Sequence, residues 1–514
     1  MQSVVAGFTA EERDLTRSVV AGLNVAWKKV FKSNIRLFTI GVSTIGGTDV
    51  IASSGGVNSD WNKYTFDDES NYLINLSYEQ ELNQPTGGMS KKIADVTLDN
   101  TSGRFTPRYA GGTSAIYTAV YKPRRPLVIN AGFNFNGINN MLPQFVGVTS
   151  KPPKIDTRSK SVQLQALDFV DFISNQYVDQ EAMFTDYRTD QILEQALISG
   201  GYSTSQYSLD YGINRVPFAE FKSGDKFGEV INKLVEAENG YFYQDESGIL
   251  RFENRQHWDS SPYTQVQRII NTHQVIEART PNTDHLINVV EVKAKPRAKQ
   301  SNQLVFTLSG TKELPALTDT EIFVQFDDPM LALDNPVYVA NTLSDGTGTD
   351  VTSSISLKSY SKFARAAKIV LRNNTSSTAF VTNMTLYGRP AKVSKEIYTR
   401  VKDDSSITAY EERPFVIDNE YIGSDSWANS YGQMILNDYS EPENLQELVI
   451  RALPELQVGD LISWQGRYWR VYGIKTSIDP NDGFIQTLRL LQRTITSYFR
   501  IGISTIGSSD AIAP

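Results

Sequence analysis

Short runs of alternating apolar and polar residues, separated by turn residues, fill much of this chain of 514 residues. Between Phe38 and about Phe172 they include VTLDNTSGRFTP, RRPLVINAGF, FVGVTSKPP and SVQLQALDFVDF. Strands place alternate residues on opposite faces, while Gly, Pro, Asn and Asp mark the turns between them. The pattern therefore predicts a β-barrel or β-sandwich in this part of the chain. Strand-like runs return from Leu304 to about Tyr387, punctuated by Gly and Pro at the spacing of a β-sandwich.

Helical patterns are fewer. Thr9 and Glu12 form a capping box ahead of an apolar stripe, which predicts an N-terminal helix ending near Lys32. The stripe consists of Leu15, Val19, Leu23, Trp27 and Val30. Such a helix packs either on its own domain or on a neighbour, and both readings stay open. Further helices are expected at Asp190–Ser199, Lys226–Glu238 and about Ser426–Leu436, the first two of them closed by Gly or Asn-Gly.

One phrase occurs at both ends of the chain. FTIGVSTIGGTDVIA (38–52) and FRIGISTIGSSDAIA (499–513) share 10 of 15 residues. Each copy alternates and then breaks at a Gly/Ser cluster, so each is expected to be a short strand and a turn. Two distant copies are not a solenoid repeat. They are either docking strands that fill similar sheet edges or a duplicated joint between modules.

Composition excludes several classes of protein. The net charge of −8 argues against a broad nucleic-acid surface, which needs clustered Lys and Arg. The absence of Cys excludes disulfides, thiolate metal sites and cysteine nucleophiles. No run reaches the ~18 to 20 apolar residues of a membrane span, and Met1 to Ala21 is too acidic for a signal peptide. The sequence thus predicts a soluble protein without a membrane anchor.

Candidate sites for chemistry are weak. His257, His273 and His285 show no metal-ligand spacing and are expected to be structural or surface residues. Residues 345–350 (DGTGTD) lack the bidentate Glu of a calcium loop and are expected to form a turn. The acidic run Asp67, Asp68 and Glu69 is interpreted as a solvated face.

Three basic pieces are expected to be exposed loops rather than phosphate sites: 122–125, 151–160 and 293–299. No nucleophile elbow, P-loop or dinucleotide fingerprint occurs. The sequence accordingly assigns no catalytic, cofactor-binding or metal-binding residue and predicts that the protein is not an enzyme.

Two stretches resemble a known family. VTLDNTSGRFTPRY (96–109), with the strands that follow it up to Asp168, resembles the opening domain of phage minor tail proteins of the tail-hub type. LPELQVGDLISWQGRYWRVYGIKTSIDPNDGFIQTLRLLQR (453–493) looks like the second barrel of the same hubs. In local terms Gly103 and Gly459 fit tight turns, which Asp99 and Asn100 can close with their side chains.

The resemblance implies a mainly β, multidomain fold with small α+β parts, two hub-type β-barrels and an inserted β-sandwich. The expected segments are an N-terminal helix (1–35), a first hub barrel (36–175), an α+β domain (176–295), a carbohydrate-binding-like or immunoglobulin-like sandwich (300–392), a second hub barrel with a helix (393–497) and a C-terminal strand (498–514).

The implied function is that of a structural virion protein, a hub at the tip of a phage tail. It would be assembled in the host cytoplasm, close the tube, adapt a sixfold tube to a threefold tip and anchor host-recognition proteins. Implied partners are two further copies of itself, a distal tail or tube protein, a tail fibre or receptor-binding protein, a tape-measure protein and a host surface glycan, while DNA passes without specific binding.

Two other functions stay open. A glycan-binding adhesin or glycan enzyme would need aromatic residues such as Tyr338 or Phe363 to form a platform on the central sandwich. A ring-forming distal tail protein would be a hexamer.

Overall fold

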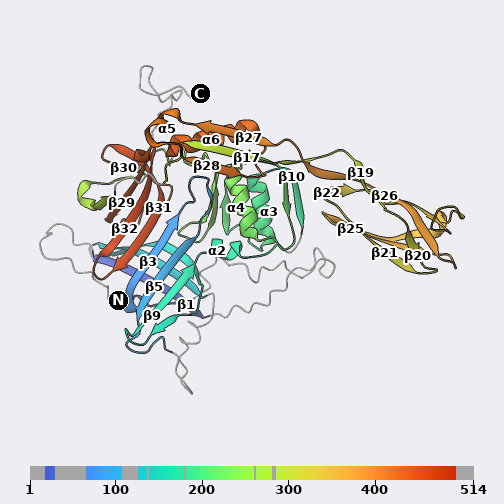
Figure 1. The fold of residues 1–514 in the computed structure, drawn as a ribbon. Helices are drawn as coiled ribbons and strands as arrows, with labels where there is room; N and C mark the ends of the chain where they lie inside the picture. Colours follow the sequence, from blue (N-terminus) through green and yellow to red (C-terminus); the bar gives the residue numbers. More distant parts are fainter. Residues whose placement is uncertain are drawn as a thin grey trace, which may run out of the picture.

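The protein is mainly β with several sheets, which confirms the predicted fold class. The computed structural model describes residues 18–28, 65–106, 125–135, 138–178, 181–259, 262–279 and 285–493. Figure 1 shows a body built from strands and a few helices, from which an arm extends to the right. Both copies of the repeated phrase, 38–52 and 499–513, lie outside the described residues.

One large sheet runs through the body and has 14 strands among the described residues. Its first half contains β1 (Ser18–Lys28), β2 (Thr65–Asp68), β3 (Leu73–Glu81), β5 (Lys92–Asp99), β6 (Pro126–Phe135), β7 (Ile138–Thr149), β8 (Lys154–Asp156) and β9 (Ser161–Leu167). Its second half contains β15 (Arg268–Ile269), β16 (Val275–Arg279), β29 (Leu445–Arg451), β30 (Leu461–Trp464), β31 (Arg467–Asp479) and β32 (Gly483–Arg493).

The two halves are joined by the antiparallel pairing of β3 with β31. The register runs from Leu76 opposite Ile478 to Glu81 opposite Gly473. Each half has an apolar core of its own, the first around Phe105 and Phe145 and the second around Trp464 and Trp469. The strand pairings of the described residues do not close either half into a ring. The chain therefore contains two halves, each with its own core, that share one sheet.

The predicted N-terminal helix is wrong within the described residues. Ser18–Lys28 is strand β1, which pairs with β6 along eight residues and with β2 on its other side. The apolar stripe misled because residues four apart share a face in a strand as well as in a helix. The sequence also alternates at Val19, Ala21, Leu23, Val25 and Trp27, and its β-branched Val residues favour a strand. Residues 1–17 lie outside the described part.

The α+β unit fills the centre of the body and contains α2 (Phe169–Ser174), α3 (Thr189–Ser199) and α4 (Phe227–Glu238). Its strands are β4 (Gly88–Met89), β10 (Ala182–Arg188), β11 (Tyr207–Leu209), β12 (Arg215–Phe221), β13 (Tyr241–Gln244) and β14 (Leu250–Glu253). The two predicted helices in this region are confirmed. Helix α2 was read as part of a strand run, but the Asp168 side chain accepts a hydrogen bond from Asp171 N and starts a helix there.

A smaller sheet covers the α+β unit and consists of β17 (Val289–Ala294), β27 (Ile397–Lys402) and β28 (Pro414–Asp418). Helix α5 (Asp404–Tyr410) follows β27, and α6 (Asp425–Tyr439) contacts both β17 and β27. The predicted helix at Ser426–Leu436 is thereby confirmed, with Ser424 as its N-cap, while α5 was not predicted.

The arm is formed by two sheets packed on a shared apolar core. One sheet contains β18 (Arg297–Lys299), β19 (Gln303–Thr307), β20 (Lys312–Leu314), β22 (Met330–Leu333), β23 (Val337–Asn341) and β26 (Ala379–Val393). The other contains β21 (Asp319–Gln325), β24 (Ile355–Lys362) and β25 (Ala366–Asn373). At the root of the arm, Arg365 donates two hydrogen bonds to Glu220 on β12, 3.1 and 2.9 Å long, which fixes the arm to the body.

The segment Asn100–Phe105, within the stretch 96–109, forms a closed turn after β5, and Phe105 lies in the core of the first half. Asn100 Oδ1 accepts a hydrogen bond from Phe105 N at 2.9 Å, and Gly103 has a φ of +72°. Arg104 donates to both carboxylate oxygens of Glu69, at 2.9 and 2.6 Å, and the Glu69 side chain is fully buried. The reading of Glu69 as a solvated acid was therefore wrong, because its partner comes from the Gly-Arg-Phe turn.

Arg104→Met should destabilise the first half, because it leaves a buried carboxylate without its partner. Breaking such a pair costs about 3 kcal/mol. We expect an earlier urea-unfolding transition, measured by tryptophan fluorescence and circular dichroism. Arg158→Met, at an exposed position in the same half, is the matched control and should leave the transition unchanged. Equal midpoints for the two variants would show that the Arg104–Glu69 pair does not stabilise the turn.

Candidate functional site at the junction of the two halves

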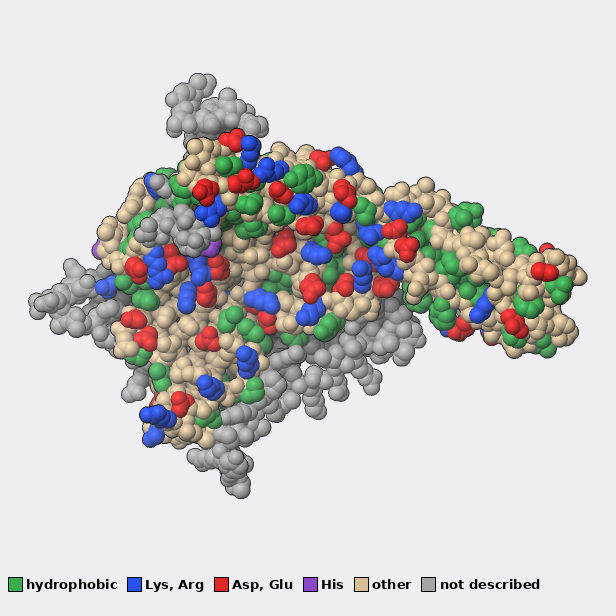
Figure 2. All heavy atoms as spheres, in the orientation of Figure 1, with side chains coloured by type: hydrophobic (Ala, Val, Ile, Leu, Met, Phe, Trp, Pro, Cys, Tyr) green, Lys and Arg blue, Asp and Glu red, His purple; other side chains and the backbone are tan. Residues whose placement is uncertain are grey.

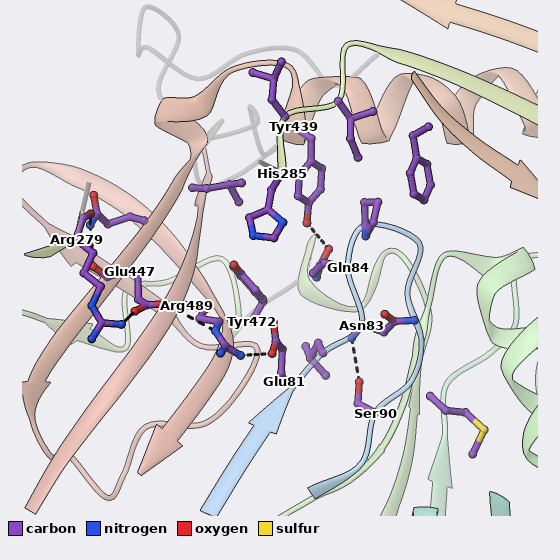
Figure 3. A pocket seen from close by; sticks show the side chains of 18 of the residues that line it. Glu81, Asn83, Gln84, Ser90, Arg279, His285, Tyr439, Glu447, Tyr472 and Arg489 are labelled. Carbon is purple, nitrogen blue, oxygen red and sulfur yellow. Dashed lines mark hydrogen bonds and ion pairs between the residues drawn. The ribbon is translucent and has the colours of Figure 1, made fainter. Parts of the chain in front are cut away.

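A groove of about 1180 Å³ lies where the two sheet halves meet the α+β unit and α6. One wall carries charged residues from β3, β16, β29 and β32, and the other carries Tyr439, Phe415 and the loop that follows β3. Figure 3 shows these walls, with Arg279, Glu447, Arg489 and Glu81 in a row on one side and Tyr439 above Gln84 on the other.

The row of charges crosses five neighbouring strands. Arg279 on β16 pairs with Glu447 on β29, and Arg489 on β32 pairs with Glu79 and Glu81 on β3. The distance from Arg489 Nη1 to Glu79 Oε1 is 2.9 Å, and Arg489 Nε lies 3.9 Å from Glu447 Oε2. Opposite charges on adjacent strands stabilise their pairing modestly. This charge row therefore ties the second half to the first.

Gly473 is what allows Arg489 to reach across the junction. Gly473 on β31 stands between Arg489 on β32 and Glu81 on β3 in the pairing register. A Cβ atom at Gly473 would lie 3.2 Å from Arg489 Cβ and 3.3 Å from Arg489 Cδ, closer than a relaxed contact. Gly473, which belongs to the stretch 453–493, thus has a local physical reason: a side chain there would collide with that of Arg489.

The loop between β3 and β5 attaches the first half to the α+β unit. Gln84 accepts a hydrogen bond from Tyr439 Oη at 2.7 Å and donates to Tyr241 Oη at 2.8 Å. Gly88 N donates to Gly240 O, and Met89 N donates to Asn232 Oδ1 on α4. Specific hydrogen bonds thus hold this wall of the groove together, and they join the first half to the α+β unit and to α6.

Buried polar side chains also connect the halves directly. Tyr78 Oη donates to Gln144 Oε1 at 2.7 Å, and Gln144 Nε2 donates to Pro454 O at 2.9 Å. Gln486 Oε1 accepts from Leu453 N at 2.8 Å. Tyr78, Gln144 and Gln486 are buried, and burial raises the pKa of the Tyr78 hydroxyl. Buried polar groups need partners, so these bonds favour one relative placement of the halves.

Asp168 is a buried group where the first half meets the α+β unit. Its carboxylate accepts hydrogen bonds from Lys92 N at 2.7 Å and from Asp171 N at 3.1 Å. The side chain is fully buried, and that burial raises its pKa to about 7 against the hydrogen bonds that lower it. Beside it, Gln244 on β13 accepts from Phe169 N and donates to Val146 O. First half and α+β unit thus share one buried polar cluster.

The candidate residues weighed from the sequence do not gather in one site. Residues 345–350 form the predicted turn, in which Asp345 accepts from Thr347 N at 2.9 Å. The piece 151–160 is largely exposed, as predicted, whereas Arg125 is buried. In the third basic piece Lys295 pairs with Glu396 and Arg297 with Asp328, each at 2.8 Å.

The three histidines also lie apart. His257 sits beside Asp210 in the α+β unit, His273 is exposed, and His285 lies in the groove. In the part of the chain that the structure describes, no group of three or more His, Asp or Glu side chains is arranged to hold a metal ion. Among the same residues no helix has the length and apolarity to span a membrane.

Tyr338 and Phe363 do not form a joint aromatic platform. Tyr338 packs against the core of the arm and its hydroxyl donates to Ile355 O at 2.9 Å. Phe363 is half exposed and lies in the β24–β25 turn, next to Arg365 at the root of the arm. Figure 2 shows Lys and Arg interspersed with Asp and Glu over this face of the body, without a large patch of one sign.

The charge row was missed because its members are far apart in the sequence. Arg489 and Glu79 are separated by 410 residues, and no local pattern links them. Two features of the sequence could have pointed to it. Glu79 and Glu81 have the spacing of one strand face, and Gly473 lies within the stretch 453–493.

Comparisons with known proteins found similar solved structures but no similar sequence. No protein-family model matches the sequence, and no curated protein matches it. Solved structures similar to it include a 43 kDa tail protein of prophage MuSo2 from Shewanella oneidensis (10% identity, TM-score 0.42, 84% of this chain and 95% of that chain). A tail protein from Neisseria meningitidis has 8% identity and a TM-score of 0.44 over 84% and 94% of the two chains.

A prophage tail protein from Listeria monocytogenes has 10% identity and a TM-score of 0.39, and the match covers 84% of this chain and 93% of that chain. All three structures are described as tail proteins. Likenesses at this level of identity and TM-score do not show the family to which the chain belongs.

Gly473→Val should weaken the junction, because the new side chain would displace Arg489 from Glu79 and Glu81. Overpacking of this kind costs about 1 to 3 kcal/mol. The expected result is a lower melting temperature by circular dichroism. Ser361→Val, at an exposed position on β24 in the arm, is the control and should melt close to wild type. If Gly473→Val also melts with the wild type, Gly473 does not provide the path for Arg489.

Asp168→Asn should change how stability depends on pH. The folded carboxyl holds its proton up to a pH of about 7, whereas an unfolded Asp holds it up to a pH of about 4. Its contribution to stability is therefore complete below pH about 4 and is lost as the pH rises through about 7. Urea midpoints measured from pH 5 to 8 should fall more steeply for wild type than for Asp168→Asn. Parallel curves would contradict the raised pKa.

Proposed function

We propose that this protein is the hub of a phage tail tip. In this role it closes the end of the tail tube, adapts the sixfold tube to a threefold tip and anchors host-recognition proteins. It would work as a homotrimer in the virion, assembled in the cytoplasm of the host bacterium, and would act by assembly rather than by catalysis.

The observation that carries the proposal is the presence in one chain of two sheet halves, each with its own core, joined edge to edge through β3 and β31. Three such subunits supply six similar halves, so a threefold assembly can face a sixfold tube. The family-like stretches fall one in each half: 96–109 begins in β5, and 453–493 contains β30, β31 and β32. In this proposal, these segments would form the ring.

Partners follow from the same arrangement. The ring of halves would contact a distal tail or tube protein and the tape-measure protein. The arm extends away from both halves. In this proposal it would contact a tail fibre, a receptor-binding protein or a host surface glycan. DNA would pass through the ring without specific binding, in keeping with the acidic balance of the chain.

The test is the mass of the purified full chain, measured by light scattering after gel filtration, together with class averages from electron microscopy. A trimer of the 57.5 kDa chain with a sixfold-looking ring is expected. A variant in which a short Gly/Ser linker replaces residues 303–389 should keep the trimer, because the arm lies outside the halves. A monomer at micromolar concentration would contradict the hub, and a hexamer would favour the distal tail protein instead.

A further inference from the structure

A polar pocket of about 260 Å³ lies apart from the groove, between the β13–β14 hairpin, β11 and the loop at Gln457–Val458. Four carboxylates line it: Asp210, Asp245, Glu246 and Glu253. The rings of Tyr243 and Tyr263 form part of its wall. No residue of the charge row or of the buried junction cluster around Asp168 lines this pocket, so it is a separate feature of the molecule.

All four carboxylates have a cationic or basic side chain nearby, and Glu253 shares His257 with Asp210. Asp245 Oδ2 accepts from Arg251 Nε at 2.9 Å, and Glu246 Oε1 accepts from Lys92 Nζ at 3.3 Å. Asp210 Oδ2 lies 2.6 Å from His257 Nδ1. The permanent positive charges at the pocket are thus Arg251 and Lys92, against four carboxylates, which leaves the pocket acidic whether or not His257 is protonated.

Only one of the two carboxylate oxygens of Glu253 has a hydrogen-bond partner. Its side chain is 7% exposed, and its Oε1 accepts from Tyr243 Oη at 2.7 Å and lies 3.2 Å from His257 Nε2. Its Oε2 is buried and has no hydrogen-bond partner in the structure. A buried carboxylate oxygen without a donor is costly, and burial raises the pKa of this carboxyl. The pocket therefore has an unused acceptor at a carboxylate.

We propose that this pocket binds an organic cation, a primary ammonium or a guanidinium group, which donates to Glu253 Oε2. Aromatic rings next to carboxylates suit a cation of this kind, because the ring faces attract the charge and the carboxylates take its N–H groups. A metal ion fits less well, since no metal-holding group of His, Asp and Glu occurs among the described residues. The cation comes either from a Lys or Arg side chain of a partner protein or from a free polyamine.

Calorimetric titration of the full chain at low ionic strength tests the pocket. The probes are butylguanidinium, the blocked tripeptide Gly-Arg-Gly and spermidine. Wild type should bind at least one of them saturably, and Glu253→Gln should bind it at least tenfold more weakly. Gln keeps the shape of the side chain and can still accept from Tyr243, so the variant should melt close to wild type. Glu229→Gln, at an exposed position on α4, is the matched control and should bind as wild type does.

The probes also separate the two sources of the cation. Tighter binding of the tripeptide would indicate a partner's side chain, and tighter binding of spermidine would indicate a polyamine; either supports the site. The proposal is overturned if wild type binds none of the probes saturably or if Glu253→Gln binds them equally well, as expected if a proton satisfies Oε2. The outcome does not depend on the oligomeric state and is therefore independent of the proposed hub function.

Discussion

The pairing of β3 with β31 is the contact on which the arrangement of the whole body depends. Without it each half of the large sheet would end in an open edge, and exposed edges are prone to pair with other chains. The pairing places Arg489 opposite Glu79 and Glu81, brings Gln144 to Pro454 and forms one side of the groove. It is a short run of backbone hydrogen bonds between distant segments, and the relative placement of the two halves depends on it.

The junction combines two kinds of interaction that act differently. The charge row lies at the surface of the groove, where water and salt weaken each pair, and it contributes mainly by favouring one alignment of the strands. The buried bond from Gln144 Nε2 to Pro454 O crosses between the halves, so a shifted placement would leave both groups buried and unpaired at a much higher cost. Specificity of the junction therefore rests more on this buried amide than on the ions.

Much of the local structure could be predicted from the sequence, because strand alternation, helix caps and turn residues are local signals. The helices α3, α4 and α6 and the turn at 345–350 are confirmed for that reason. Ser18–Lys28 was misassigned because a spacing of four fits a strand and a helix equally. Glu69 was misjudged because its partner Arg104 is 35 residues away. The candidate site could not be predicted, since the charge row and the Glu253 pocket exist only once distant strands meet.

The junction also has a consequence for the timing of synthesis. Asn75 on β3 and Asp479, at the end of β31, are hydrogen-bonded although 404 residues separate them. A ribosome adding ~5 to 20 residues per second needs roughly 20 to 80 seconds between the two. During that interval the nascent first half has a free β3 edge, because its partner strand β31 has not yet been made. A chain that stops before β31 would therefore lack the junction altogether.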